Sequence, residues 1–454
     1  MAGSSSSSKR KLTAPVSPPP LRRKVQVQSG TTQNAVASFF MPTSQKPPEK
    51  MQWYERGAHG DSPKTLLVGK YVPVNDDSAD ANDKKRRKVA AFDFDSTLVT
   101  TSSGKKFASD AQDWKWWHPS VPRTLRKLYR EDGYRIVVIS NQAGISMRPD
   151  PKLPKAHHSK LSVFKTKAAA VFSQLDLPIS IYAATEKDIF RKPRMGMWKE
   201  LLQDYDIHLP GDLDLENSLM VGDAGGRTAD GGKQKDFSCS DRNFASNTGI
   251  AFHTPEEFFL KEEPRPFVRT FDPCEYLRAG VPEAVAQVYA KTNNQDIILF
   301  CGSPGAGKST FYWKQLEPLG YARVNQDTLK SREKCLKVAE ECLDAGKSVA
   351  VDNTNADIEV RSKWVELAAK HSVPIRCVLF TAPAEVCEHN DVVRSLNKEM
   401  NPEKRAILPS LAFRGFASRY QRPVITEGFQ DITEVAFTFS GSDSEWQIWQ
   451  KYWT

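Results

Sequence analysis

The stretch that decides the fold of the first half of the chain is Asp93-Phe94-Asp95-Ser96-Thr97-Leu98, which follows the apolar run Val89-Ala90-Ala91-Phe92. A short apolar run ended by polar residues predicts a buried β-strand. The carboxylates of Asp93 and Asp95 then lie at the carboxyl end of that strand, the edge at which open α/β sheets bind ligands. Asp-x-Asp alone is weak evidence of a site, because it also occurs in helix caps and calcium loops.

Three further groups of polar residues follow downstream in the same kind of setting. Ser140 and Asn141 end the apolar run at 136–139, and Asp223 ends the run at 219–221. Lys192 lies between them in the stretch Arg191-Lys192-Pro193-Arg194-Met195-Gly196-Met197-Trp198. Because the carboxyl ends of parallel strands meet at one edge of a sheet, we expect a shared site there. Its predicted members are Asp93, Asp95, Ser140, Asn141, Lys192 and Asp223.

This order of elements resembles the haloacid dehalogenase superfamily of phosphatases. The resemblance implies that Asp93 attacks phosphorus and Asp95 donates a proton to the leaving oxygen. It further implies that Ser140 and Asn141 hold phosphoryl oxygens, that Lys192 steadies the phosphoryl group, and that Asp93, Asp95 and Asp223 hold Mg²⁺. Ser96 stands where the motif usually has Gly, which should be tolerated if the backbone there is not left-handed.

The substrate class follows from the short intervals between these motifs. Members of the superfamily that act on small metabolites usually carry a large cap domain, for which neither early interval is long enough. The first interval also alternates cations with aromatic residues, as nucleic-acid binding requires; these are Lys105, Lys106, Trp114, Lys115, Trp116 and Trp117. Packing into the core is the alternative interpretation for the tryptophans.

A second site begins where the apolar run at 297–301 enters Gly302-Ser303-Pro304-Gly305-Ala306-Gly307-Lys308-Ser309-Thr310. This is a full Walker A pattern between a predicted strand and a predicted helix. Backbone N–H groups of such a loop wrap the phosphates of ATP, which Gly302, Gly305 and Gly307 permit. Lys308 is expected to reach the β- and γ-phosphates and Ser309 to ligate Mg²⁺, with Thr310 beside it.

Polar residues after the next strands suggest a kinase. Asp327 follows the run at 321–324 and can take a proton from an acceptor hydroxyl. A second polar cluster, at 352–355, follows the run at 348–351. Arg394 is a candidate lid arginine for the charge that develops during transfer, with an ordinary surface arginine as the alternative. The sequence has no guanine-reading motif, which favours ATP over GTP.

Together these motifs resemble the polynucleotide kinase 3′-phosphatase family over roughly residues 88 to 440, including the order of the two domains. The stretch Lys235-Asp236-Phe237-Ser238-Cys239-Ser240-Asp241-Arg242 and the cluster Asp352-Asn353-Thr354-Asn355 add to the match. The resemblance implies DNA-end healing in strand-break repair, by removal of 3′-phosphates and ATP-dependent phosphorylation of 5′-hydroxyls, with Asp327 as base. We expect the forkhead-associated module of the animal enzymes to be absent. The alternatives are a small-molecule phosphatase fused to a small-molecule kinase, and a non-catalytic nucleic-acid-binding scaffold.

Length and composition agree with two domains of the α/β class. The chain has 454 residues, a mean hydropathy of −0.52 and a net charge of +9, which suits a polyanionic partner. No apolar run has the length of a membrane span, so we expect no membrane association, and we expect a monomer. The predicted organisation is a disordered basic tail at 1–50, a variable lead-in at 51–87, a phosphatase domain at 88–262, a connection at 263–295 and a P-loop kinase domain at 296–454.

The tail has its own signals. Two short basic clusters, at 9–11 and 22–24, flank a Pro-rich spacer and favour nuclear import over a merely solvated segment. Gln33, Val36, Phe39 and Phe40 resemble a peptide that binds a sliding clamp. Because two adjacent Phe residues in a polar tail have no core of their own, they need a pocket elsewhere. That pocket lies either on a clamp or on the enzyme's own surface.

Overall fold

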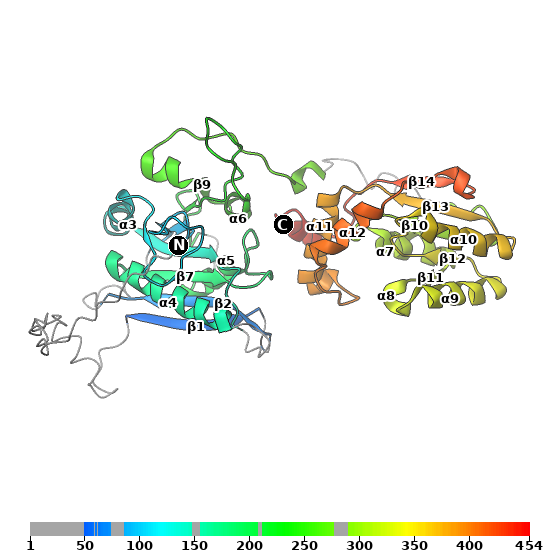
Figure 1. Cartoon of the computed structure of the whole chain (residues 1–454), viewed down its shortest axis with the longest axis horizontal. Helices are drawn as coiled ribbons and strands as arrows, with labels where there is room; N and C mark the ends of the chain where they lie inside the picture. The colour runs from blue at the N-terminus through cyan, green and yellow to red at the C-terminus, as the bar shows by residue number, and fades with distance from the viewer. Residues whose placement is uncertain are drawn as a thin grey trace, which may run out of the picture. The chain divides into compact units, whose positions relative to one another are not determined.

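The computed structural model describes residues 50–58, 60, 62–73, 86–147, 155–207, 211–276 and 289–454. The predicted basic clusters and the clamp-like peptide with Gln33, Val36, Phe39 and Phe40 lie outside the described residues. The described residues build two large sheets with helices packed on them, one from the blue-to-green part of the chain and one from the yellow-to-red part (Figure 1). The predicted α/β class with two domains is confirmed.

The first sheet has seven strands in the order β1-β2-β7-β6-β3-β8-β9. The strands β3, β6, β7, β8 and β9 are parallel, because helices or long connections return the chain between them. Their bounds are β1 Met51–Gly57, β2 Lys64–Tyr71, β3 Lys88–Phe92, β6 Tyr134–Asn141, β7 Ile179–Ala184, β8 Leu219–Val221 and β9 Ala251–His253; a small separate ladder pairs β4 Val99–Thr100 with β5 Lys115–Trp116.

Helices cover both faces of this sheet. One core cluster packs α3 and α4 against alternate residues of β3, such as Ala90 and Phe92, and the other packs α5 and α6 against Val89 and Ala91. Two-sided burial explains why β3 is apolar from Val89 to Phe92 instead of alternating with polar residues. The helices are α3 Ser120–Arg130, α4 Lys155–Leu175, α5 Gly196–Asp204, α6 Ser240–Thr248 and the turns η2 Glu256–Leu260 and η3 Pro273–Tyr276.

The hairpin of β1 and β2 lies within the predicted lead-in at 51–87. It joins the first sheet because β2 pairs antiparallel with β7, from Leu66 opposite Ala184 to Tyr71 opposite Ile179. Leu66, Leu67 and Val68 are fully buried, and this apolar burial holds the hairpin to the domain. The first sheet therefore begins before residue 88, the predicted start of the phosphatase domain.

The second sheet has five parallel strands in the order β11-β12-β10-β13-β14. Alternate residues of β10 face two cores, with Ile297 and Leu299 against α9 and α10, and Ile298 and Phe300 against η4, α11 and α12. The strands are β10 Ile297–Cys301, β11 Ala322–Val324, β12 Val349–Val351, β13 Ile375–Phe380 and β14 Ile432–Val435. The helices and turns are α7 Lys308–Phe311, η4 Tyr312–Leu316, η5 Glu317–Leu319, α8 Gln326–Leu329, α9 Arg332–Asp344, α10 Ile358–Lys370, α11 Ala384–Leu396, η6 Lys398–Met400, α12 Ser410–Arg419, η7 Ile425–Glu427 and α13 Asp443–Trp449.

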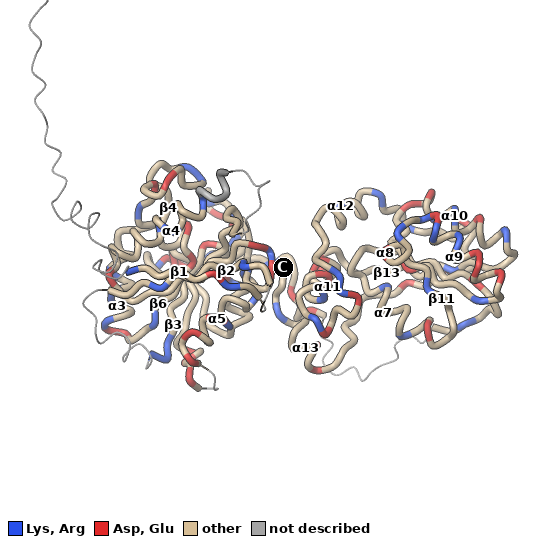
Figure 2. The backbone as a smooth tube through the Cα atoms, turned by 90° about the horizontal axis from the view of Figure 1, so that it is seen from below, with Lys and Arg blue, Asp and Glu red and all other residues tan. Residues whose placement is uncertain are grey.

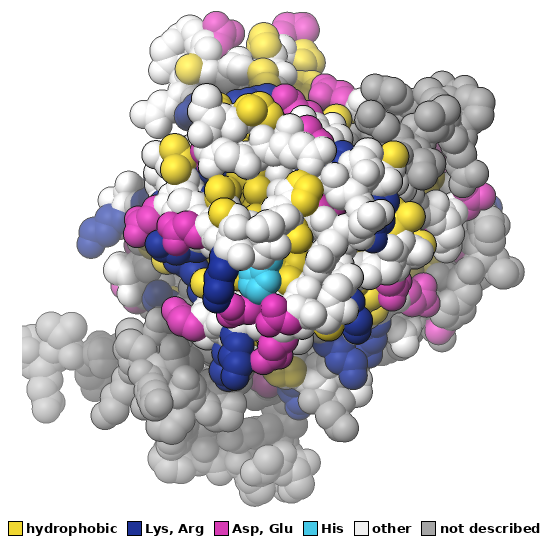
Figure 3. Space-filling view, turned by 90° about the vertical axis from the view of Figure 1, so that its right-hand side faces the viewer, with side chains coloured by type: hydrophobic (Ala, Val, Ile, Leu, Met, Phe, Trp, Pro, Cys, Tyr) yellow, Lys and Arg dark blue, Asp and Glu magenta, His cyan; other side chains and the backbone are white. Residues whose placement is uncertain are grey.

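Charged residues of both signs alternate over the described surface. Figure 2 shows Lys and Arg interspersed with Asp and Glu along the backbone of both domains, and on the face seen in Figure 3 the two signs lie side by side. Pairs such as Arg376 with Asp431 are examples. Within the described residues no helix is both long enough and apolar enough to cross a membrane.

Candidate active sites

Three carboxylates meet at the carboxyl edge of the first sheet. Asp93 follows β3 and Asp223 follows the neighbouring strand β8, while Asp241 comes from the first turn of α6. One carboxylate oxygen from each lies within 4.8 Å of the others. Gly222 is required here, because a Cβ at that position would come 2.3 Å from the Asp241 carboxylate. Sequence reasoning expected Asp93 and Asp223 but did not assign Asp241.

Lys192 is the cation of this cluster. Its Nζ donates to Asp93 Oδ1 and to the carbonyl of Ile139, each at 2.7 Å, and lies 2.8 Å from Asp241 Oδ1. Asn141 fixes the Lys192 backbone, since Asn141 Oδ1 accepts from its N–H and Asn141 Nδ2 donates to its carbonyl. The Asn141 amide, which was expected to hold a phosphoryl oxygen, thus also positions Lys192.

Burial and mutual repulsion shift the acids of the cluster. Burial raises the pKa of Asp93 to about 6 against the opposing charge of Lys192. Burial, together with the charges of Asp93 and Asp241, raises the pKa of Asp223 to about 8. Burial alone would lower the pKa of Lys192, but Asp241 and Asp93 raise it to about 12. Three carboxylates with one ammonium group leave excess negative charge, and their oxygens fit a divalent cation.

The Asp95 carboxylate, predicted as a further metal ligand, is not one of the three that meet in that cluster and has two other partners. Lys167 Nζ donates to its Oδ1 at 2.7 Å, and Gln142 Nε2 donates to its Oδ2 at 2.8 Å. These two bonds turn the carboxylate toward α4, while its side chain stays half exposed. Asp241 supplies the third carboxylate that lies close to Asp93 and Asp223. Gln142 also donates to Ser140 Oγ at 3.0 Å, which places Ser140 beside Asp95.

A cationic and aromatic surface is formed by the loops that follow Asp95 and Asp223. Lys106 Nζ lies 5.7 Å from the ring of Phe107 and 5.6 Å from that of Phe237. Phe107 is 77% exposed and Phe237 97% exposed, so neither ring serves the core. Asp113 fixes the first loop by accepting bonds from Ser102, Ser103 and Ser109. The tryptophans of this interval, Trp114, Trp116 and Trp117, instead pack against the core.

The second site surrounds the loop between β10 and α7. Gly305 has a φ of +77°, and a Cβ there would come 2.2 Å from the Cys387 carbonyl. Gly307, with a φ of +94°, precedes α7. Lys308 is buried, and its Nζ donates to the carbonyls of Gly302 and Ser303 at 3.0 and 2.6 Å. These backbone constraints shape the loop that wraps phosphates in P-loop proteins. Thr310 is exposed in the first helical turn and lines the same pocket.

A hydroxyl and a carboxylate beside the loop already face a positive charge. Ser309 Oγ donates to Asp352 Oδ2 at 2.8 Å, and Arg323 donates to both groups, with Nη2 at 3.1 Å from Ser309 Oγ and Nε at 2.8 Å from Asp352 Oδ2. The chemistry of this oxygen pair fits a divalent cation. Asp352 was expected only as part of a polar cluster.

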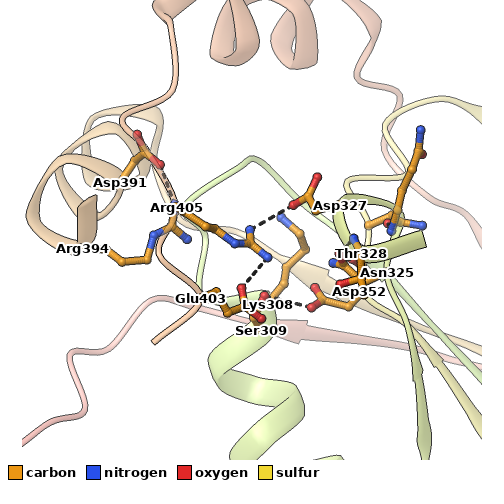
Figure 4. A network of polar contacts seen from close by, with 12 residues as sticks. Lys308, Ser309, Asn325, Asp327, Thr328, Asp352, Asp391, Arg394, Glu403 and Arg405 are labelled. Atoms are coloured by element: carbon orange, nitrogen blue, oxygen red, sulfur yellow. Dashed lines mark hydrogen bonds and ion pairs between the residues drawn. The ribbon is translucent and has the colours of Figure 1, made fainter. Parts of the chain in front are cut away.

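Asp327 and two arginines line the same pocket (Figure 4). Asp327 is mostly exposed on α8, whose first turn is capped by Asn325 Oδ1, and Arg405 Nη1 lies 3.1 Å from Asp327 Oδ2. Arg394, the predicted lid arginine, donates instead to Asp391 at 2.6 Å. Arg405 was not predicted, because it lies in a loop to which no sequence period assigns a position.

Comparisons with known proteins agree with this geometry. A family described as "Polynucleotide kinase 3 phosphatase" matches residues 88–259, and one described as "AAA domain" matches residues 297–423. The bifunctional polynucleotide phosphatase/kinase of Schizosaccharomyces pombe is 41% identical over 81% of this chain and 84% of its own length. A protein of Acanthamoeba polyphaga mimivirus described in similar terms is 32% identical over 79% and 88% of the two chains. The polynucleotide 3′-phosphatase of Arabidopsis thaliana is 32% identical over 39% of this chain and 25% of its own.

Fold and sites thus define a phosphatase of the haloacid dehalogenase type joined to a P-loop kinase, an enzyme whose domains imply ATP and a divalent metal. The chain belongs to the family of bifunctional polynucleotide phosphatase/kinases.

Proposed function

We propose that this enzyme heals DNA ends during strand-break repair, removing 3′-phosphates and phosphorylating 5′-hydroxyls with ATP. The observation that carries the proposal is the surface on the loops that follow Asp95 and Asp223, where Lys106, Phe107 and Phe237 present a cation and two exposed rings. Exposed rings beside a cation suit stacked bases and a phosphate backbone, because every base has a π-face. This surface is what a terminal nucleotide needs and a small metabolite does not.

In the phosphatase centre, the Asp93 carboxylate attacks the phosphorus of the 3′-phosphate while Asp95 donates a proton to the departing 3′-oxygen. Lys192, held by Asn141, keeps Asp93 oriented and offsets charge on the phosphoryl oxygens. Asp93, Asp223 and Asp241 would hold Mg²⁺, which supplies further charge neutralisation when bound. Water then hydrolyses the phosphoryl-aspartate and releases inorganic phosphate.

In the kinase centre, Asp327 takes the proton of the 5′-hydroxyl as that oxygen attacks the γ-phosphate. Lys308 contacts the phosphates of ATP, and Ser309 with Asp352 would hold the nucleotide's Mg²⁺. Asp327 suits the role of base because its carboxylate is mostly exposed in the pocket that Lys308 also lines.

One assay tests both activities. The substrate is a single oligonucleotide with 5′-hydroxyl and 3′-phosphate ends, incubated with Mg²⁺ and labelled ATP. Asp93→Asn should remove 3′-dephosphorylation and leave 5′-phosphorylation intact, and Lys308→Ala should do the reverse. Asp95→Asn should slow dephosphorylation by roughly a hundred- to ten-thousand-fold, the usual contribution of a positioned proton donor. If Asp93→Asn and Lys308→Ala each abolished both activities in folded protein, the two-centre assignment would be wrong.

We also propose that the enzyme is a monomer and that its N-terminal tail directs it to the nucleus and to a sliding clamp. The support is compositional, namely the basic clusters at 9–11 and 22–24 and the peptide with Gln33, Val36, Phe39 and Phe40. Replacing Phe39 and Phe40 with Ala should abolish clamp binding and leave both activities on short oligonucleotides unchanged. Unchanged clamp affinity would remove the proposal, and a loss of catalysis would indicate docking on the enzyme itself.

A further inference from the structure

Arg394 and Arg405 both line the kinase pocket, but only one of them faces the reacting groups. Arg394 donates to Asp391, which is only 1% exposed and which also accepts from the Leu408 backbone N–H at 2.8 Å. Asp391 thereby ties α11 to the segment at 401–409 that precedes α12 (Figure 4). Arg394 therefore helps to hold that segment in place, because its guanidinium bonds to the Asp391 carboxylate that also accepts from Leu408.

Arg405 lies on the same segment and points to the catalytic groups. Its Nη1 is 3.1 Å from Asp327 Oδ2, on the side of the acceptor hydroxyl. On the side of the nucleotide it lies close enough to Lys308 to matter electrostatically, since burial lowers the pKa of Lys308 and the charge of Arg405 lowers it further. The Arg405 guanidinium therefore contacts the proposed base and lines the same pocket as Lys308, the group that contacts the γ-phosphate.

The backbone and side chain of Arg405 are both held in place. Asn401 Oδ1 accepts from the Arg405 N–H at 2.9 Å, and Asn401 Nδ2 donates to the Arg405 carbonyl at 2.8 Å. Glu403 Oε2 holds Arg405 Nη2 at 2.6 Å, while its Oε1 accepts from Arg323 Nη1 at 2.7 Å. The Glu403 carboxylate thus lies between two guanidinium groups. One is that of Arg323, near Ser309 and Asp352, and the other is that of Arg405, near Asp327. A cation held in this way needs little reorganisation during the reaction.

We propose that Arg405 is a further catalytic residue of the kinase centre, whose guanidinium binds the phosphoryl group while it passes from ATP to the 5′-hydroxyl. The proposal rests on the kinase activity proposed above. The O5′–phosphorus bond forms as the bond from the γ-phosphorus to the bridging oxygen breaks. The hydroxyl proton passes to Asp327, and ADP leaves with the electron pair. Arg405 makes no covalent bond, and its charge offsets that on the transferred oxygens.

The test compares Arg405→Ala and Arg405→Lys with Arg414→Ala, which removes an exposed arginine of α12 outside the pocket lining. We expect Arg405→Ala to lower kinase kcat by about a thousand-fold. This is the lower end of the roughly 10³- to 10⁵-fold contribution of an arginine that stabilises the transition state of phosphoryl transfer. The KM for ATP should change less than about threefold, because the contact is made mainly in the transition state. Lys should restore part of the rate, and Arg414→Ala should keep it. Undiminished 3′-phosphatase activity would show that each variant is folded.

A binding measurement separates this role from a structural one. Arg405→Ala should bind ADP as the unchanged enzyme does but lose the tighter binding of ADP with aluminium fluoride, which imitates the transferred phosphoryl group. Equal losses for both ligands, or an unchanged kcat, would overturn the proposal. It would also fail if the defect vanished on an acceptor whose first internucleotide linkage is a neutral methylphosphonate, because Arg405 would then bind the acceptor strand. Absence of kinase activity from the unchanged enzyme would instead refute the proposed function.

Discussion

Asp93, Asp223 and Asp241 together carry more negative charge than Lys192 balances. This excess makes the stability of the phosphatase centre depend on pH. The pKa values of Asp93 and Asp223 are raised to about 6 and about 8, above those of an unfolded aspartate. The native state then binds more protons than the unfolded state between about pH 4 and pH 8. The stability these groups provide is complete below the unfolded pKa and is lost as the pH rises through the folded values.

We therefore predict that the metal-free enzyme becomes less stable between pH 5.5 and pH 8.5, and that Mg²⁺ reverses the loss. Thermal unfolding in EDTA and in Mg²⁺ measures it, with a gain from Mg²⁺ that is larger by roughly 5 °C at the higher pH. Asp223→Asn removes one of the shifted carboxylates and should flatten the pH dependence in EDTA. A gain from Mg²⁺ that did not depend on pH would contradict the linkage.

Ser96 adopts a φ of +60°, which lies in the left-handed region. The sequence analysis had made tolerance of Ser96 conditional on a backbone outside that region. For a residue with a Cβ this conformation costs roughly 1–2 kcal/mol. Ser96→Gly should relieve that strain, while the freer unfolded chain takes back about 0.4–1 kcal/mol. We predict a net stabilisation of about 1 kcal/mol or less, measured by denaturant unfolding of the phosphatase domain. Ser103→Gly, which has no positive φ to relieve and loses the hydrogen bond from Ser103 Oγ to Asp113, should instead destabilise the protein.

The loop at 101–113 shows how one buried carboxylate organises an element without regular secondary structure. Backbone and hydroxyl bonds from Ser103, Ser109 and Ser102 hold the pKa of Asp113 well below its usual range. The carboxylate stays ionised and keeps its five hydrogen bonds, and so fixes the loop that presents Lys106 and Phe107.

Asp113→Asn should loosen that loop and weaken the binding of oligonucleotide ends. We predict a KM for a 3′-phosphorylated oligonucleotide raised by about tenfold, with little change for a small phosphomonoester that does not reach Phe107 or Phe237. Phe237→Ala serves as the matched variant, because loss of one stacked base costs roughly 1–3 kcal/mol without altering the loop. Equal effects on both substrates would show that Asp113 supports the acid cluster and not the surface formed by Lys106, Phe107 and Phe237.

The strands that carry the sites could be predicted because each apolar run ends in polar residues at one sheet edge. Asp93 and Asp223 follow this rule, and the structure brings them together. Asp241 does not, because it lies on α6, and the stretch at 235–242 that contains it matched the family without a role for any of its residues. Lys167 and Arg405 come from a helix and a loop whose positions depend on tertiary packing. The β1–β2 hairpin was missed because it joins a largely parallel sheet in the antiparallel sense.

Across the whole molecule the positive charge is unevenly distributed along the sequence. Residues 1–49 contain seven Lys or Arg and one acidic residue, which leaves residues 50–454 a net charge of +3 of the total of +9. The described surface mixes both signs, and many of its cations are paired, such as Arg56 with Glu200 and Asp204. Two thirds of the net charge that favours a polyanion therefore belongs to the tail.

Deleting residues 1–49 should accordingly reduce the salt dependence of DNA binding more than it reduces catalysis. Each lost phosphate contact with single-stranded DNA lowers the slope of log K against log salt by about 0.7, because fewer counterions are released. We expect a slope smaller by about 2 or more for the deletion, and an unchanged rate of 3′-dephosphorylation at saturating oligonucleotide. Affinities between low and physiological salt, measured by anisotropy of a labelled strand, give the slopes.

A full-length variant with Gln at Lys9, Arg10, Lys11, Arg22, Arg23 and Lys24 separates charge from length, and it should behave like the deletion. Equal slopes for all three proteins would place the phosphate contacts entirely on residues 50–454.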